Sequence, residues 1–208
     1  DVLRALVEPS AVEAHRARAM DPDRPVLRGT SQNPDTYFQA REAVEPFYAA
    51  FPDVVAETME TLGRLVGRRY RLFDYVGHPE AERVVVMMGS GAECADETVE
   101  YLVARGERVG LVKVRLFRPF AVAHFTRVLP RSVASLTVLD RTKEPGASGE
   151  PLYQEVVGAL VDAHADGRLA SIPRLASGRY GLASKELTPA MIKAVLDDMA
   201  TPAPRRRF

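Results

Sequence analysis

The sequence predicts a layered α/β domain in which strands and helices alternate. Apolar residues at helical spacing and short β-branched runs follow one another regularly from about residue 53 onward. The run VVVMM at 84–88 carries no charge, which is typical of a strand buried on both faces. Strands separated by helices should become parallel neighbours joined by right-handed crossovers. We therefore expect a sheet that helices cover on both faces.

Residues 1–52 differ from the remainder because they are rich in proline and charge. Asn33 followed by Pro34 is typical of a helix N-cap and first helical position. Pro46 should break or kink the helix that starts there. We interpret this region as an arm or linker rather than an independent core.

The elements of the domain itself, residues 53–202, follow in chain order. An apolar helix face ends at Gly67, and RYRLFDY at 69–75 has strand composition with the charges that an edge strand tolerates. A helix follows the buried strand 84–88, and another can start at Pro119. The remaining predicted elements are strands at 108–117, 135–140 and 173–178, helices at 150–165 and from Thr188 onward, and a solvated tail at 203–208.

Composition and charge exclude several classes of function. Twenty-eight basic residues balance 28 acidic ones, so no large field would recruit nucleic acid or an anionic membrane. Cys94 is the only cysteine, which rules out an internal disulfide and is compatible with a reducing, cytoplasmic compartment. The longest apolar stretches are about a third of the roughly 20 residues that span a bilayer. The start at Asp1 rather than Met suggests an excised fragment or a processed product.

The turn GSGAEC at 89–94 is the first candidate for a cofactor site. Gly89, Gly91 and Cys94 occupy the places of G-x-G-x-x-G, so the third glycine, which allows close packing of helix on strand, is missing. Three carboxylates in or near the first turn of the next helix would also repel a phosphate; they belong to Glu93, Asp96 and Glu97. We interpret the segment as a plain turn from strand to helix, with Ser90 available as a cap.

Two other segments lie where predicted strands end. Arg115 and Arg118 leave the strand 108–117 at a position that often faces a ligand crevice, although pairing with surface carboxylates explains them equally well. The loop LDRTKEPGASGEP at 139–151 contains a Pro-Gly turn and could serve a ligand or a partner domain. The four histidines show no metal-ligand spacing. The residues by themselves therefore predict an α/β domain without a self-contained catalytic site.

Five separated segments resemble, in order, landmarks of the pyruvate:ferredoxin (flavodoxin) oxidoreductases. The resemblance extends over about residues 10–200, nearly the whole chain. The segments are RGTSQNPDTYFQARE (28–42), RLFDYVGHPEAERVVVMMGSGAE (71–93), KVRLFRPF (113–120), VLDRTKEPGASGEPLY (138–153) and GRYGLASKELTPAMIKAV (178–195). The resemblance implies a domain like the C-terminal domain of transketolases, a three-layer α/β/α sandwich on a five-stranded mixed sheet. Four strands would be parallel, and RYRLFDY would be the antiparallel one.

The resemblance also implies what surrounds this domain. Residues 1–52 would be the end of a thiamine-pyrimidine domain and its connecting arm. The whole enzyme would be a homodimer that converts pyruvate and coenzyme A to acetyl-CoA and CO2 and passes electrons to ferredoxin or flavodoxin. It would carry thiamine diphosphate, magnesium and [4Fe-4S] clusters outside this segment, because four thiolates are needed for a cluster and Asp166-Gly167, preceded by Ala165, does not form a GDG motif.

We therefore expect a non-catalytic domain that docks other domains of the same chain. A contact with coenzyme A through Ser90, Gly91, Arg115 and Arg118 is a secondary hypothesis, because arginine binds phosphate in bidentate fashion. Aromatic residues are candidates for docking surface or, alternatively, for core; they are Tyr37, Phe38, Phe47, Phe117 and Phe120. Two rival functions are an independent dinucleotide-binding oxidoreductase domain and a binding subunit of a related oxoacid oxidoreductase.

Overall fold

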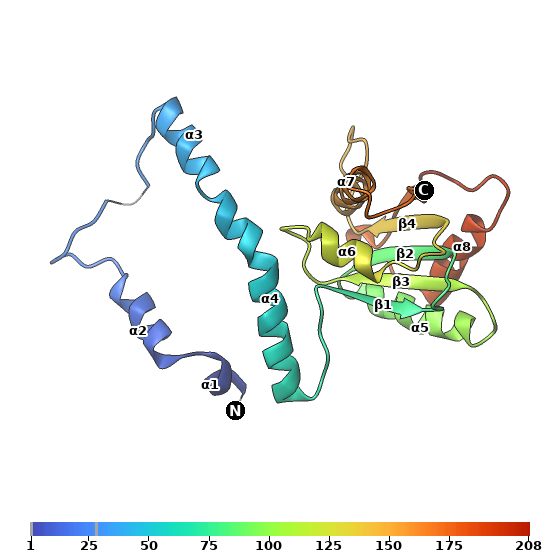
Figure 1. Ribbon diagram of the computed structural model, residues 1–208, viewed down its shortest axis with the longest axis horizontal. Helices are drawn as coiled ribbons and strands as arrows, with labels where there is room; N and C mark the ends of the chain where they lie inside the picture. The colour runs from blue at the N-terminus through green and yellow to red at the C-terminus, as the bar shows by residue number, and fades with distance from the viewer. Residues whose placement is uncertain (1, 28) are drawn as a thin grey trace. The chain divides into compact units, whose positions relative to one another are not determined.

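The computed structural model describes residues 2–27 and 29–208, which divide into two compact units, Asp1–Arg71 and Leu72–Phe208 (Figure 1). Asp1 and Arg28, the first residue of the 28–42 motif, lie outside the described residues. We call the second unit the sheet domain. It begins at Leu72 and not near residue 53, because the preceding helix belongs to the first unit.

The first unit consists of the helices α1 (Val2–Leu6), α2 (Pro9–Ala17), α3 (Pro34–Glu42) and α4 (Glu45–Val66). Asn33 is the N-cap residue of α3, as predicted, and α3 ends shortly before Pro46. Pro46 lies in the first turn of α4. Backbone N–H groups there have no acceptor within the helix, so the missing N–H of proline costs no hydrogen bond. The helix predicted from residue 53 thus starts eight residues earlier, and it continues through Pro52 to a left-handed cap at Gly67.

The sheet domain contains a five-stranded sheet in the order β1-β3-β2-β4-β5. Four strands are parallel, and only β1 runs antiparallel, against β3, so the expected mixed sheet is confirmed. The strands are β1 (Phe73–Gly77), β2 (Arg83–Met88), β3 (Val109–Val114), β4 (Ser135–Asp140) and β5 (Arg174–Arg179). The strand pairing explains why the strands predicted at 69–75 and 108–117 have different bounds in the structure. Phe73 pairs with Val114, where β1 begins and β3 ends, and just beyond this pair Leu72 O accepts hydrogen bonds from Arg115 N and Leu116 N without a further strand pair.

Helices form a layer on each face of this sheet (Figure 1). On one side α6 (Val122–Val128) contacts α7 (Pro151–Ala165), and on the other α5 (Gly91–Val103) contacts α8 (Pro189–Met199). The sandwich fold is therefore the predicted one. Among the described residues, no helix combines the length and the apolar character that crossing a membrane requires.

Three phenylalanines pack edge to face beneath α6. The ring centroids of Phe73, Phe120 and Phe125 lie 5.1–5.5 Å apart, and Phe73 and Phe125 are fully buried. Phe120 is partly buried and packs against this cluster, which favours the core alternative for this residue. In the first unit, by contrast, Phe38 and Phe47 are 68% and 77% exposed, as expected for an apolar surface that something else covers.

The tail at 203–208 is exposed over most of its length, as predicted, but its end also pairs with the sheet. Ser177 of β5 donates its N–H to Arg206 O and accepts from Phe208 N, so residues 206–208 lie parallel to the outer edge of β5. The Phe208 ring packs against Gly178, where an added Cβ would lie 2.4 Å from it. The short pairing therefore covers part of the exposed edge of β5.

Candidate functional site

The strand order places one ligand-binding position of the fold between β2 and β4. The connection after β2 leads to its neighbour β3, and the connection after β3 leads back past β2 to β4. The carboxyl ends of β2 and β4 therefore form the topological switch point. Open α/β sheets commonly bind ligands in the crevice at this point. Gly89 and Ser90 directly follow β2 there, and Gly91 begins α5.

Tyr180, which follows β5, fills this crevice from within. Its hydroxyl donates to Met88 O over 3.3 Å, and its own N–H donates to Asp140 O. A Cβ placed on Gly91 would lie 2.6–2.8 Å from the phenol group, so the glycine is needed for the close approach of this ring. Burial raises the pKa of Tyr180, which keeps the phenol neutral. The glycine turn therefore packs a tyrosine where a nucleotide phosphate would have to lie, which argues against the dinucleotide-binding function.

Replacing Gly91 with alanine should destabilise the sheet domain by about 1–3 kcal/mol, because the new methyl group collides with Tyr180. The double variant Gly91→Ala/Tyr180→Ala should cost less than the sum of the two single variants. Urea unfolding of the four proteins measures this coupling. Gly158→Ala is the matched control, since its Cβ would meet nothing within 4 Å and α7 should gain stability. Strictly additive losses would contradict the packing role of Gly91.

Two of the three carboxylates at the start of α5, those of Glu93 and Asp96, pair with a lysine that the motif analysis did not consider. Lys113 of β3 lies 2.5 Å from Asp96 Oδ2 and 3.3 Å from both carboxylate oxygens of Glu93. Burial alone would lower the pKa of Lys113, but Asp96 and Glu93 outweigh it and the pKa is raised. Ion pairs thus link the first turns of α5 to strand β3 of the sheet. A lysine in the middle of an otherwise apolar strand, VGLVKV, was the available signal.

The two predicted arginines both face carboxylates. Arg115 Nε donates to Asp74 Oδ2 of β1 over 2.9 Å, and Arg118 Nε donates to Glu155 Oε1 of α7 over 2.8 Å. They therefore diverge, toward β1 and toward α7, instead of converging on Ser90 and Gly91. Ser90 is the N-cap residue of α5 but forms no side-chain capping bond.

Hydrogen bonds to two buried carboxylates, those of Asp140 and Glu150, hold the 139–151 loop in place. Asp140 accepts hydrogen bonds from the amides of Leu152 and Tyr153 and so caps α7 from the end of β4. Glu150 accepts from Glu144 N over 2.7 Å and pairs with Lys143 and Arg179, each at 3.3 Å. Burial raises the pKa of Asp140. Burial would also raise the pKa of Glu150, but the Glu144 amide and the two cations lower it.

Replacing Glu150 with glutamine should remove a pH-dependent part of the stability. Because the folded-state pKa of Glu150 is lowered, its contribution is present above the unfolded-state pKa and is lost as the pH falls through the folded-state pKa. The gap in unfolding free energy between wild type and Glu150→Gln should therefore be largest near neutrality and shrink in acid. Urea titrations from pH 7 downward measure it, and Asp166→Asn, at an exposed pair, is the control. A gap that is constant with pH would contradict this assignment.

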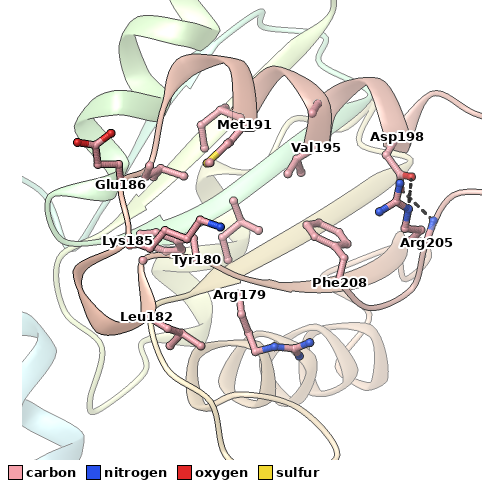
Figure 2. Close-up of a pocket in the computed structure, with 15 residues that line it drawn as sticks. Arg179, Tyr180, Leu182, Lys185, Glu186, Met191, Val195, Asp198, Arg205 and Phe208 are labelled. Carbon is pink, nitrogen blue, oxygen red and sulfur yellow. Dashed lines mark hydrogen bonds and ion pairs between the residues drawn. The ribbon is translucent and has the colours of Figure 1, made fainter.

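A pocket of about 400 Å³ opens between the end of β5, the segment 181–187 and α8 (Figure 2). Its floor is apolar and continuous with the core of the sheet domain. We call it the α8 pocket. Its apolar lining includes Leu139, Leu187, Met191, Ile192, Val195 and Phe208. Much of the lining comes from GRYGLASKELTPAMIKAV, the segment whose resemblance to the family the sequence analysis noted.

Two family models match consecutive parts of the chain. Residues 1–60 match the thiamine diphosphate-binding region of pyruvate flavodoxin/ferredoxin oxidoreductases, and residues 81–179 match pyruvate:ferredoxin oxidoreductase core domain II. The pyruvate-flavodoxin oxidoreductase of Rhodospirillum rubrum is 60% identical over 100% of this chain. The chain belongs to the pyruvate:ferredoxin (flavodoxin) oxidoreductase family. Membership confirms the resemblance that the five sequence segments indicated.

The chain spans less than a fifth of most of these family members. It covers 18% of the Rhodospirillum rubrum protein and 17% of the pyruvate:ferredoxin oxidoreductase of Moorella thermoacetica, to which it is 54% identical. It covers 50% of a pyruvate-flavodoxin oxidoreductase sequence from Nostoc sp. strain PCC 7119. Among solved structures, a 2-oxoglutarate:ferredoxin oxidoreductase from Magnetococcus marinus aligns with a TM-score of 0.42 and 18% identity over 72% of this chain and 23% of that one. In family members the segment thus lies within a longer polypeptide.

Proposed function

We propose that the sheet domain is a non-catalytic structural and docking domain of a pyruvate:ferredoxin (flavodoxin) oxidoreductase. The whole enzyme converts pyruvate and coenzyme A to acetyl-CoA and CO2 and reduces ferredoxin or flavodoxin. Thiamine diphosphate, magnesium and [4Fe-4S] clusters belong to other domains of the same chain, and the enzyme is a homodimer. The sheet domain holds those domains in place, and residues 1–52 are the end of the thiamine-pyrimidine domain with its connecting arm.

The observation that carries this proposal is the closed switch point of the sheet. Tyr180 occupies the crevice, and Lys113 pairs with Glu93 and Asp96 beside it. Arg115 and Arg118 are engaged with Asp74 and Glu155. The chemical groups that would serve a reaction at this edge are thus used to hold the fold together.

Loosening the sheet domain in the intact enzyme should separate stability from chemistry. Phe125→Ala should lower the thermal unfolding midpoint and the yield of assembled enzyme, because it removes a fully buried ring from the core of the sheet domain. The kcat per bound thiamine diphosphate and the KM for pyruvate should stay within about twofold of wild type. A large fall in kcat per occupied site in a correctly assembled variant would contradict a purely structural role. Pyruvate oxidation by the purified 208-residue chain would contradict it as well.

A contact with coenzyme A at Ser90, Gly91, Arg115 and Arg118 is a second candidate function. It is favoured by the position of both arginines shortly after the carboxyl end of β3, although their side chains diverge and a phosphate would have to displace their carboxylate partners. The variant Arg115→Ala/Arg118→Ala of the intact enzyme should then raise the apparent KM for coenzyme A about tenfold. Arg105→Ala, at the opposite end of α5, is the matched control. An unchanged KM for coenzyme A would rule out this contact.

A further inference from the structure

The rim of the α8 pocket is formed by a short segment in an unusual backbone conformation. Gly181, Ala183 and Ser184 all have positive φ angles, of 65°, 50° and 62°. For alanine and serine this left-handed conformation costs conformational energy, and such residues concentrate at ligand clamps and contact sites. Leu182, between them, is 42% exposed although it is apolar. The segment thus exposes the Leu182 side chain to solvent on a turn with a strained backbone.

The floor of the pocket belongs to the hydrophobic core on the α5 and α8 side of the sheet. Ile192 is fully buried, and Val195 and Phe208 pack against the same cluster. Met191, on the open side of α8, is 41% exposed. An incoming apolar side chain would therefore extend an existing core and would not have to create one.

The charge at the mouth of the pocket is unbalanced. Arg205 pairs with Asp198, and Arg179 shares the buried Glu150 with Lys143, so both arginines have a carboxylate partner. Among the described residues, the side chain of Lys185 forms no ion pair or hydrogen bond. Figure 2 shows the Lys185 side chain extending toward the centre of the pocket residues, whereas Glu186 points away from them. Among the described residues, Lys185 therefore gives the mouth of the pocket one unpaired positive charge, which favours a partner that carries a negative charge.

We propose that the α8 pocket receives a segment from another part of the same oxidoreductase polypeptide, one that carries a large apolar side chain next to an aspartate or glutamate. The apolar side chain enters the pocket, and the carboxylate pairs with Lys185. More than four-fifths of the length of the Rhodospirillum rubrum relative lies outside the part that this chain covers, so the neighbouring domains of one polypeptide supply ample partner surface. A diffusible ligand is less well served, because the lining is mostly apolar and, among the described lining residues, Lys185 is the charged group that is both unpaired and directed inward. This inference rests on the proposed docking function and names one of its contacts.

Photo-crosslinking in the intact oxidoreductase tests the occupant directly. Met191 is replaced with p-benzoylphenylalanine in one variant and Leu182 in a second, so that one position remains if the other disturbs folding. After irradiation we expect one dominant crosslinked peptide from outside residues 1–208, at the mass of a single polypeptide on a denaturing gel. Mass spectrometry should place an Asp or Glu beside a large apolar residue in that peptide.

The charge requirement is tested in the same crosslinking background. Lys185→Ala should lower the crosslink yield about fivefold, because the carboxylate loses its partner. Lys193→Ala is the matched control, since Lys193 also belongs to the α8 region but pairs with Asp197 and does not line the pocket. It should leave the yield unchanged.

Several results would overturn the proposal. A crosslink to a second copy of the chain, seen as a doubled mass, would do so, and so would the absence of any crosslinked peptide at both positions. A small molecule that native mass spectrometry finds bound in the pocket would do so too. The last such result is a crosslink yield that does not respond to Lys185→Ala. None of these results bears on kcat per occupied site in Phe125→Ala. The failure of this contact and the failure of the structural role are therefore distinguishable.

Discussion

Replacing Lys113 with methionine should destabilise the sheet domain by about 3 kcal/mol, because it leaves the Asp96 carboxylate without a counter-charge. The Asp96 side chain is only 20% exposed, and its second oxygen, Oδ1, is buried without a hydrogen-bond partner. Glu93 is largely exposed and can return to water. Most of the loss should therefore come from Asp96. Urea or thermal unfolding of this chain measures it.

A second substitution distinguishes the ion pair from the packing of the lysine stem. Lys113→Met/Asp96→Leu should recover most of the lost stability, because an apolar pair of similar volume avoids the desolvation of both charges. Lys193→Met breaks an exposed pair on α8 and should change stability little. A double variant that is no more stable than Lys113→Met alone would show that the charge on Asp96 is not the source of the loss.

Replacing Phe125 with alanine should cost about 3–5 kcal/mol, the largest single effect expected in the sheet domain. The ring is fully buried and contacts both Phe73 and Phe120 edge to face, so its removal leaves a cavity between α6 and the sheet. Phe125→Leu should cost clearly less, since it fills most of the cavity. Thermal unfolding of the variants gives the comparison.

The matched control is Val161→Ala on α7, where the side chain is 48% exposed. It should change stability by about 0.5 kcal/mol or less. Equal losses for Phe125→Ala and Phe125→Leu would indicate that the aromatic contacts matter more than the cavity. A loss near zero for Phe125→Ala would contradict the burial of the ring.

These positions also show why local sequence patterns did not reveal the candidate site. GSGAEC connects β2 to α5 as predicted, but its missing third glycine is only one part of the argument against a phosphate there. Tyr180 closes the crevice, and it lies about 90 residues further along the chain than Gly91. Lys113 and Glu150 likewise act through partners on other elements. Contacts of this kind have no local spacing, so they become visible only when the strands are placed side by side.

The sequence alone determined the fold class, the buried strand 84–88, the antiparallel first strand and membership of the oxidoreductase family, because hydrophobic periodicity and family-specific segments are local features of the chain. The tertiary structure decided where α4 belongs, that residues 206–208 pair with β5, that Arg115 and Arg118 diverge, and that Lys185 at the α8 pocket is unpaired within the part of the chain that the structure describes. Each of these depends on the register and order of strands that are distant in sequence. Burial and charge compensation are set by that arrangement and not by any single segment.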